Sequence, residues 1–272
     1  MGLRHPGNLS AVGRNKCCSL STSHPVTPDG WYVANHKRNN RMHEYITIKS
    51  DAGDFGAYVS YPEADKAPSV VVLHEVFGVN EDVRQTCDAL AAQGFIAVAP
   101  DLFWRQQPGV DLGVTSEADW KAGLALYMAY NRDEGVADVI ATIAAAGKLK
   151  GATGKVAVMG YCLGGLMTFL TAARSKVDAA VAFHGGDTES YLAEAGSIDA
   201  PFLMHLAEED EYITKTAQAD IKKALAGKPN VVIYSYPGCN HAFSRHGGAH
   251  YDAAAAKLAN DRTWAFLKEK LA

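Results

Sequence analysis

The sequence predicts an α/β protein built on one doubly wound, mostly parallel β-sheet flanked by helices. Two observations carry this prediction. Apolar runs of four to six residues recur along the 272-residue chain, as in strands buried on both faces of a parallel sheet. Helical patterns separate these runs as far as the C-terminus, with no linker or internal repeat. We therefore expect residues 42–272 to form a single domain.

The elements follow in chain order. Alternating residues over 45–48 and 55–61, with turn-forming residues between them, predict an opening antiparallel ribbon. Apolar runs predict buried strands at 69–73, 96–99, 156–159, 179–183, 202–206 and 231–234. Helices are predicted at 81–93, 116–146 with a break near Asn131, 164–174, 214–226 and 251–271.

Residues 1–41 differ from the rest of the chain. They contain six basic residues against one acid, three prolines and no apolar period. Such a segment cannot offset the entropy of ordering, so we expect a disordered, non-catalytic extension, with Met42 as a sensible start. The basic, serine-containing composition is faintly like a transit peptide, but the prolines oppose an amphipathic helix, and readthrough or an expression leader fits better.

Charge and cysteine usage exclude several classes of function. Twenty-six basic and thirty acidic residues give a net charge of −4, so no broad cationic field attracts nucleic acid or an anionic membrane. No apolar run is long enough to span a bilayer. The five cysteines are an odd number without the paired spacing of a zinc site or disulfide framework, which favours a reducing, cytoplasmic compartment. We expect no metal.

The strongest chemical signal is Gly160-Tyr161-Cys162-Leu163-Gly164, which joins a predicted strand to a predicted helix. This is the pattern of a nucleophile elbow with sulfur in place of oxygen. A side chain at either outer glycine would collide with neighbouring backbone. The pattern places Cys162 at a helix N-terminus, where unpaired N–H groups favour negative charge. The Leu163 N–H is the natural oxyanion donor, and the loop after residue 73 should supply a second.

An elbow also requires an acid and then a histidine, each after a later strand. The strand at 202–206 leads to Glu208, Glu209 and Asp210, and the strand at 231–234 leads to His241. His241 would accept the Cys162 proton and Asp210 would fix the imidazole tautomer. Either neighbouring glutamate could replace Asp210, and nine other histidines compete with His241. Strand placement and chain order favour Asp210 and His241.

Four ordered motifs resemble the dienelactone hydrolase family, a cysteine branch of the α/β-hydrolase fold. They are His74 to Asn80, Pro100 to Phe103, Gly160 to Gly165 and His241 to Arg245, and the likeness runs from about Met42 to Leu271. The resemblance implies a monomer without metal or cofactor. It also implies ring opening of an unsaturated lactone, carboxymethylenebutenolide, to maleylacetate.

The resemblance also implies two charged site residues. Glu75 matches a glutamate that holds the resting thiol until substrate arrives, although a helix cap or a pair with an arginine is the structural alternative. Arg245 matches an arginine that binds the substrate carboxylate, and a guanidinium fork suits that anion. An ordinary surface arginine is the rival interpretation of Arg245.

The sequence departs from the family pattern at three substrate positions. Trp120 stands where the family has another arginine, Leu124 where it has a tyrosine, and Ala242 where it has a serine. Lys121 is a substitute cation, and Phe103 and Trp120, with Trp104 unless that residue is core, are expected to form a more aromatic wall.

We therefore predict a carboxylic ester hydrolase that opens a small ester or dienelactone-like lactone through a Cys162 thioester. The alternative within the enzyme class is a carboxylesterase or thioesterase acting on another small acyl compound. A different class, a thiol redox sensor, would use Cys239 as the resolving partner of Cys162.

Overall fold

The structure is a computed structural model that describes residues 36–38 and 41–272. The strands are β1 (His36–Arg38), β2 (Arg41–Ser50), β3 (Gly53–Ser60), β4 (Ala67–Leu73), β5 (Ile96–Pro100), β6 (Ala152–Tyr161), β7 (Ala179–Phe183), β8 (Phe202–Ala207) and β9 (Val231–Tyr236). The helices are α1 (Glu81–Ala92), α2 (Glu117–Ala129), α3 (Arg132–Ala146), α4 (Leu163–Arg174), the 3₁₀ helix η1 (Thr188–Ser197), α5 (Lys215–Ala224) and α6 (Ala253–Lys270).

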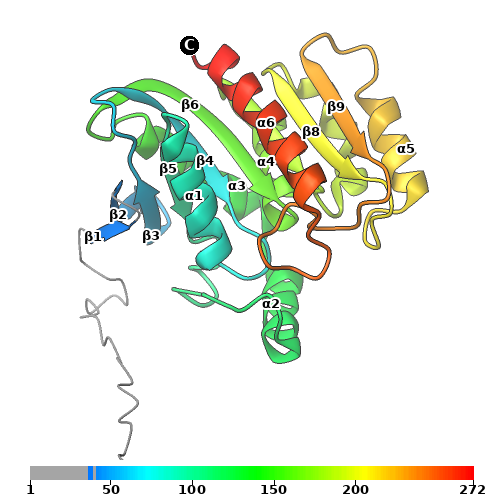
Figure 1. The fold of residues 1–272 in the computed structure, drawn as a ribbon, viewed down its shortest axis with the longest axis horizontal. Helices are drawn as coiled ribbons and strands as arrows, with labels where there is room; N and C mark the ends of the chain where they lie inside the picture. The colour runs from blue at the N-terminus through cyan, green and yellow to red at the C-terminus, as the bar shows by residue number, and fades with distance from the viewer. Residues whose placement is uncertain (1–35, 39–40) are drawn as a thin grey trace, which may run out of the picture.

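In the described part of the chain the strands form one sheet in the order β1-β2-β3-β5-β4-β6-β7-β8-β9 (Figure 1). The first three strands pair antiparallel, and β3 is also antiparallel to β5. From β5 to β9 every neighbouring pair is parallel. The predicted ribbon and the mostly parallel sheet of an α/β hydrolase are therefore confirmed.

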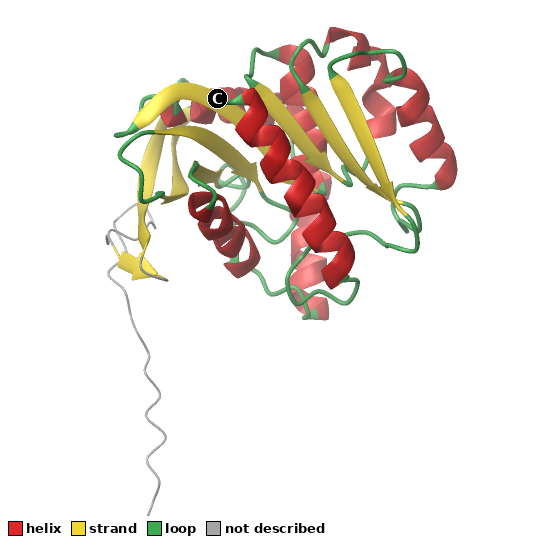
Figure 2. Cartoon of the chain, turned by 45° about the horizontal axis from the view of Figure 1, so that its top comes forward, coloured by secondary structure: helices red, strands yellow, loops and turns green. Residues whose placement is uncertain are grey.

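Two layers of helices cover the sheet. Successive residues of β4 point to opposite faces, so Val71 and Leu73 join a core with α3, α4 and α5, while Val70 and Val72 join a core with α1 and α6. Figures 1 and 2 show α1 and α6 together on one side of the sheet. Burial on both faces explains why these strands are unbroken apolar runs rather than alternating ones.

The strand order reverses at β4, which has β5 on one side and β6 on the other. Open α/β sheets hold their ligands at the carboxyl ends of the strands beside such a reversal. The topology therefore directs attention to the loops that follow β4 and β6.

The predicted helices are present, and the expected break near Asn131 is real. Asn131 caps α3 by accepting hydrogen bonds from the N–H groups of Asp133 and Glu134, while Tyr130 before it is extended. The 3₁₀ helix η1 was not predicted, since its residues show no apolar period.

The predicted extension, residues 1–41, lies mostly outside the described residues. Its last part contributes β1 and the first residue of β2. None of the helices in the described ranges has the length and apolar character needed to cross a membrane.

Candidate active site

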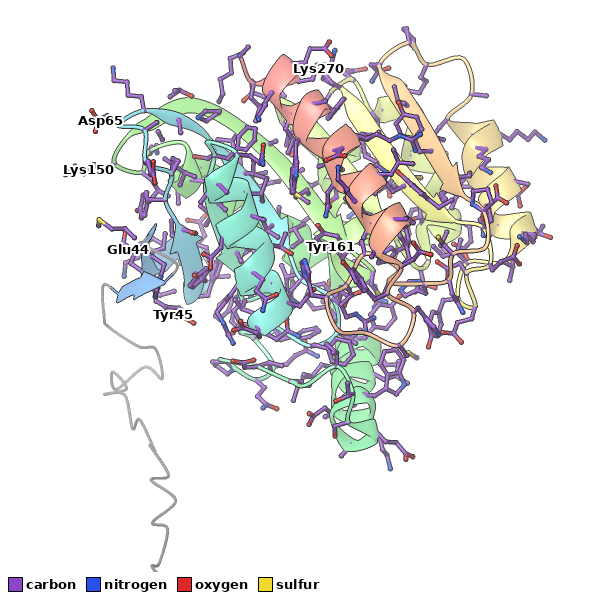
Figure 3. All side chains as sticks on the ribbon, in the orientation of Figure 1. Glu44, Tyr45, Asp65, Lys150, Tyr161 and Lys270 are labelled. Carbon is purple, nitrogen blue, oxygen red and sulfur yellow. The ribbon has the colours of Figure 1, made fainter. Side chains whose placement is uncertain are left out.

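Cys162 lies at the sharp turn between β6 and α4. Its backbone has φ 52°, a left-handed value that costs a non-glycine residue roughly 1–3 kcal/mol. A Cβ at Gly160 would approach the Gly164 carbonyl oxygen to 2.3 Å, and one at Gly164 would approach the Leu73 oxygen to 2.1 Å. Both glycines are thus required by backbone contact, as the elbow pattern predicts. Tyr161, directly before the sulfur, projects from the end of β6 between α1 and α6 (Figure 3).

Two segments with candidate backbone N–H donors border the sulfur. Leu163 is the first residue of α4, and the first N–H groups of a helix have no partner within it. Val76, in the loop after β4, lines the same cavity as Cys162. That loop is held to the elbow because Gly164 donates its N–H to the His74 oxygen at 3.1 Å.

The loops after β8 and β9 bring Asp210 and His241 together. His241 Nδ1 lies 2.9 Å and 3.0 Å from the two carboxylate oxygens of Asp210. Asp210 Oδ1 also accepts the N–H groups of Tyr212 and Ile213, which fixes the carboxylate. Glu209 instead pairs with Lys215 at the surface. Of Glu209 and Asp210, it is therefore Asp210 that lies within hydrogen-bond distance of the imidazole.

His241 lines the Cys162 cavity, and its Nε2 is buried. Burial lowers the pKa of His241, but the Cys162 charge and the hydrogen bond to Asp210 outweigh it and raise that pKa to about 10. Cys162 lies close enough to His241 to contribute to this pKa. Hydrogen bonds in active sites are often long until substrate binds. The raised pKa favours the imidazolium form of His241.

Glu75 pairs with Arg245. A pair with an arginine was the structural alternative to a contact between Glu75 and the Cys162 thiol. Its Oε2 lies 2.7 Å from Arg245 Nε, and both side chains are largely buried. Burial raises the pKa of Glu75, although the Arg245 charge opposes that rise. The Arg245 guanidinium also stacks over Phe77, 5.0 Å from the ring centre. Arg245 is thus not an ordinary surface residue, and its charge already has a partner.

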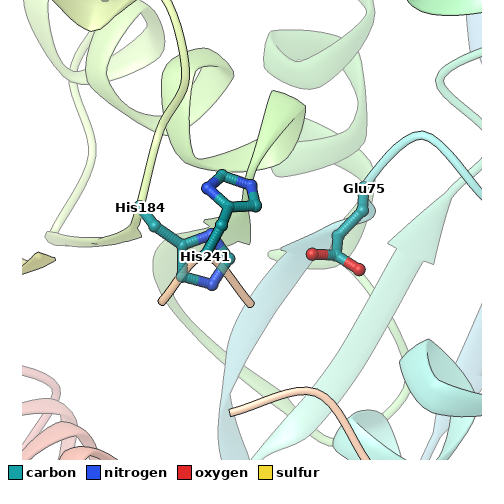
Figure 4. Close-up of side chains that lie close together, drawn as sticks. All are labelled: Glu75, His184 and His241. Carbon is teal, nitrogen blue, oxygen red and sulfur yellow. The ribbon is translucent and has the colours of Figure 1, made fainter. Parts of the chain in front are cut away.

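Among the described residues, one group of three side chains could be considered for a metal: Glu75, His184 and His241, whose ligand atoms lie within 4.8 Å of one another. Figure 4 shows the two imidazoles against each other with the Glu75 carboxylate facing them. Ligands about 2.1 Å from a four-coordinate zinc lie only roughly 3.4 Å apart. Because Glu75 already pairs with Arg245 and His241 with Asp210, we assign no metal here.

His184 differs from the other buried histidines. His74 and His205 have partners on both ring nitrogens, whereas neither nitrogen of His184 has one. Its ring centre lies 4.5 Å from that of His241. Burial, followed by the His241 charge, holds the pKa of His184 well below its usual value. A neutral imidazole therefore lies against the imidazole that carries the proton.

The cavity at Cys162 has a volume of about 180 Å³. Its apolar and aromatic wall comes from Val76, Trp120, Leu124, Tyr127 and Tyr212, and Gly186 and Asp187 complete the lining around Cys162 and His241. Cys162 is half-buried and lines this cavity.

The structure brings some predicted wall residues to this cavity and not others. Trp120 lines it, next to Phe77 and Tyr212. Phe103 is fully buried in the core against His74, and Lys121 is exposed outside the lining. Helix geometry explains the position of Lys121, because its side chain points roughly a quarter turn away from that of Trp120.

Four residues near the sulfur were missed by the sequence analysis: Tyr127, His184, Asp187 and Tyr212. Tyr127 continues the 120, 124 spacing of one helix face, so helical period could have found it. His184 and Asp187 follow β7, and Tyr212 follows β8, so the strand-end rule used for Asp210 applies equally to them.

Cys239 does not line the Cys162 cavity. It is buried in the core on the α1 and α6 side of the sheet, and burial raises the pKa of its thiol. Both cysteines are free. This arrangement gives the redox-sensor alternative no support.

Comparisons with known proteins find relatives of this chain. The model of the dienelactone hydrolase family matches residues 55–271. An Azospirillum brasilense protein assigned as a carboxymethylenebutenolidase is 42% identical over 222 residues, covering 81% of this chain and 96% of the relative. Carboxymethylenebutenolidase 1 of Cupriavidus pinatubonensis is 36% identical, covering 82% and 94%. The crystal structure of a Klebsiella pneumoniae protein assigned as a dienelactone hydrolase superposes with a TM-score of 0.75 at 28% identity, covering 85% of this chain and all of that one.

Proposed function

The chain belongs to the dienelactone hydrolase family, and from that premise we propose that it hydrolyses a small carboxylic ester or lactone through a Cys162, His241 and Asp210 triad. The observation that carries the proposal is the meeting of three loops in one place. The strained Cys162 shares a cavity with His241, and His241 Nδ1 is hydrogen-bonded to Asp210.

The first half of the proposed reaction forms a thioester. The proton shared by Cys162 and His241 lies on Nε2 when the sulfur attacks the ester carbonyl carbon. The carbonyl oxygen becomes an oxyanion that accepts hydrogen bonds from the N–H groups of Leu163 and Val76. When this adduct collapses, the carbon–oxygen bond of the ester breaks and His241 returns the proton to the leaving oxygen. In a lactone that oxygen stays attached to the acyl chain.

The second half releases the product. A water gives its proton to His241 and attacks the thioester carbonyl, and the departing sulfur takes the proton back. Asp210 stays ionised and holds Nδ1–H toward itself, so that Nε2 can exchange the proton in both halves. Every step uses groups of the chain and water, in keeping with an enzyme that works without a cofactor.

The substrate has two candidate classes. The relatives are named carboxymethylenebutenolidases, which favours a lactone of that type. The mostly apolar wall of the cavity favours the second class, another small acyl ester or thioester. We further propose that the enzyme acts in the cytoplasm as a monomer and that residues 42–272 are sufficient for activity.

The Cys162→Ala variant tests the triad. It should abolish turnover of a 4-nitrophenyl ester while keeping the melting temperature, because the substitution removes only the sulfur of a half-buried residue. Mass spectrometry of the unaltered protein, quenched during turnover, should find the acyl group on the Cys162 peptide. Cys239→Ala is the matched control and should retain turnover. Undiminished activity of Cys162→Ala would reject the proposal.

A further inference from the structure

Opposite the triad, the described residues that line the cavity include one with a formal charge, Asp187, and that charge is negative. Asp187 follows β7 with φ 64° and is placed by the hydroxyl of Tyr127, which donates to its Oδ2. Both residues line the cavity with Cys162. The other wall side chains, from Val76, Trp120, Leu124 and Tyr212, are apolar or aromatic.

The nearby cations are already engaged. Arg132 pairs with Asp187 at 3.5 Å, donates to the carbonyl oxygens of Tyr127 and Tyr130, and lies over the Tyr127 ring, outside the lining. Arg245 borders an adjoining cavity and pairs with Glu75 at 2.7 Å. Within the described part of the chain, no arginine or lysine lines the cavity that contains the sulfur.

A substrate carboxylate in this cavity would therefore lose water without gaining an unpaired cation. Desolvation of an unpaired charge is unfavourable, and like charges repel. Asp187 is half-exposed, so solvent weakens its repulsion and the missing cation matters more. An uncharged group would instead bury apolar surface against Trp120 and Tyr212, whose rings lie 6.0 Å apart.

We propose that this cavity selects substrates with an uncharged acyl group and discriminates against a carboxylate on that group, with Leu124 and Asp187 as specificity-determining residues. The proposal rests on the proposed function, because it needs Cys162 to be the acylated atom. It narrows the substrate class to neutral small esters and lactones.

Two esters that differ by one methyl group, and therefore in charge, test the proposal. They are mono-4-nitrophenyl succinate, which carries a carboxylate, and 4-nitrophenyl methyl succinate, in which a methyl ester removes that charge. We expect kcat/KM to be at least about tenfold higher for the neutral ester, with most of the difference in KM. Equal rates, or a preference for the anionic ester, would overturn the proposal.

Variants then locate the origin of the preference. Leu124→Arg introduces a cation into the cavity wall and should reduce the preference at least about fivefold. Met128→Arg is the matched control, because Met128 is 72% exposed on the same helix and outside the lining, and it should keep the preference. Asp187→Asn should reduce the preference two- to threefold, an effect that shrinks in high salt. If Leu124→Arg and Met128→Arg behave alike, or Asp187→Asn changes nothing, the assigned residues are wrong.

Simple 4-nitrophenyl acetate separates the two proposals. An enzyme that forms an acetyl thioester on Cys162 but prefers the anionic succinate contradicts the specificity proposal alone. An enzyme that turns over none of the three esters contradicts the proposed function, and the specificity proposal with it.

Discussion

The two sides of the cavity are built differently. On the triad side, Cys162, Asp210 and His241 follow three parallel strands and are held by backbone contacts and buried hydrogen bonds. On the wall side, Leu124 lies on α2, a helix in which Gly123 is the one buried residue, and Leu124 itself is 41% exposed. The comparison suggests that the chemistry needs a fixed geometry, whereas substrate preference is set by side chains that can change without disturbing the core.

The largest expected effect comes from the triad side. Asp210→Asn should keep the fold but lower kcat by about 10³–10⁴-fold, because an amide at that position favours the wrong imidazole tautomer. Glu209→Gln, one residue away in a surface pair with Lys215, should change kcat less than twofold. Steady-state kinetics on a 4-nitrophenyl ester measure both. Similar losses in the two variants would contradict the assignment of Asp210.

The largest effect on stability should come from the buried pair of Glu75 and Arg245. Arg245→Gln leaves Glu75 buried without its partner and should lower the free energy of unfolding by about 3 kcal/mol. Lys215→Gln breaks an exposed pair and should cost at most about 1 kcal/mol. Urea unfolding followed by circular dichroism measures both.

The Arg245→Gln loss should also depend on pH. The folded pKa of Glu75 is raised above its unfolded value, and removing the arginine removes a contribution that opposes this rise. A raised pKa gives stability that is present at low pH and lost as the pH rises through the folded pKa. The destabilisation should therefore grow with pH, and a loss that is constant across pH would show that Glu75 is not the cause.

A substitution in the turn between β6 and α4 should cause a smaller loss of stability. Gly164→Ala places a Cβ 2.1 Å from the Leu73 oxygen, so backbone must move, and we expect a cost of about 1–3 kcal/mol with lowered activity. Gly196→Ala meets no atom within 4 Å and should be neutral. Thermal unfolding compares the two variants. Equal melting temperatures would mean that the turn is looser than its contacts indicate.

These differences explain what the sequence could predict. Gly160, Cys162 and His241 belong to a pattern fixed by strand order, and burial on both faces makes each strand visible as an apolar run. The wall depends on which side of a helix a residue faces and on contacts between distant loops. Phe103 was expected in the wall as an aromatic residue of a family motif, but it packs into the core against His74. Asp187 follows β7, so strand order places it at the same edge of the sheet, but the sequence does not show its contact with Tyr127, sixty positions away.

The ionisation of His241 tests whether the sulfur and the imidazole act as a pair. Its pKa is raised to about 10, and the Cys162 charge is the largest contribution in that direction. Cys162→Ala should therefore lower this pKa, which NMR titration of the imidazole measures. In the unaltered protein the raised pKa adds stability that is fully present below the unfolded value of about 6.5 and lost as the pH rises toward 10. An unchanged pKa in Cys162→Ala would mean that the two groups do not interact.

A substitution in the cavity wall should give the smallest effect on catalysis. Leu124→Ala removes apolar contact from the cavity, but because the side chain is 41% exposed, only part of its transfer free energy is at stake, about 1 kcal/mol or roughly a fivefold rise in KM for a neutral ester. Because Leu124 is not one of the three triad residues, kcat should change less than twofold. Met128→Ala, 72% exposed and outside the lining, should leave KM unchanged. If Leu124→Ala instead lowers kcat strongly at constant KM, the wall helps to position the reacting groups, and the division between a fixed triad side and an adjustable wall does not hold.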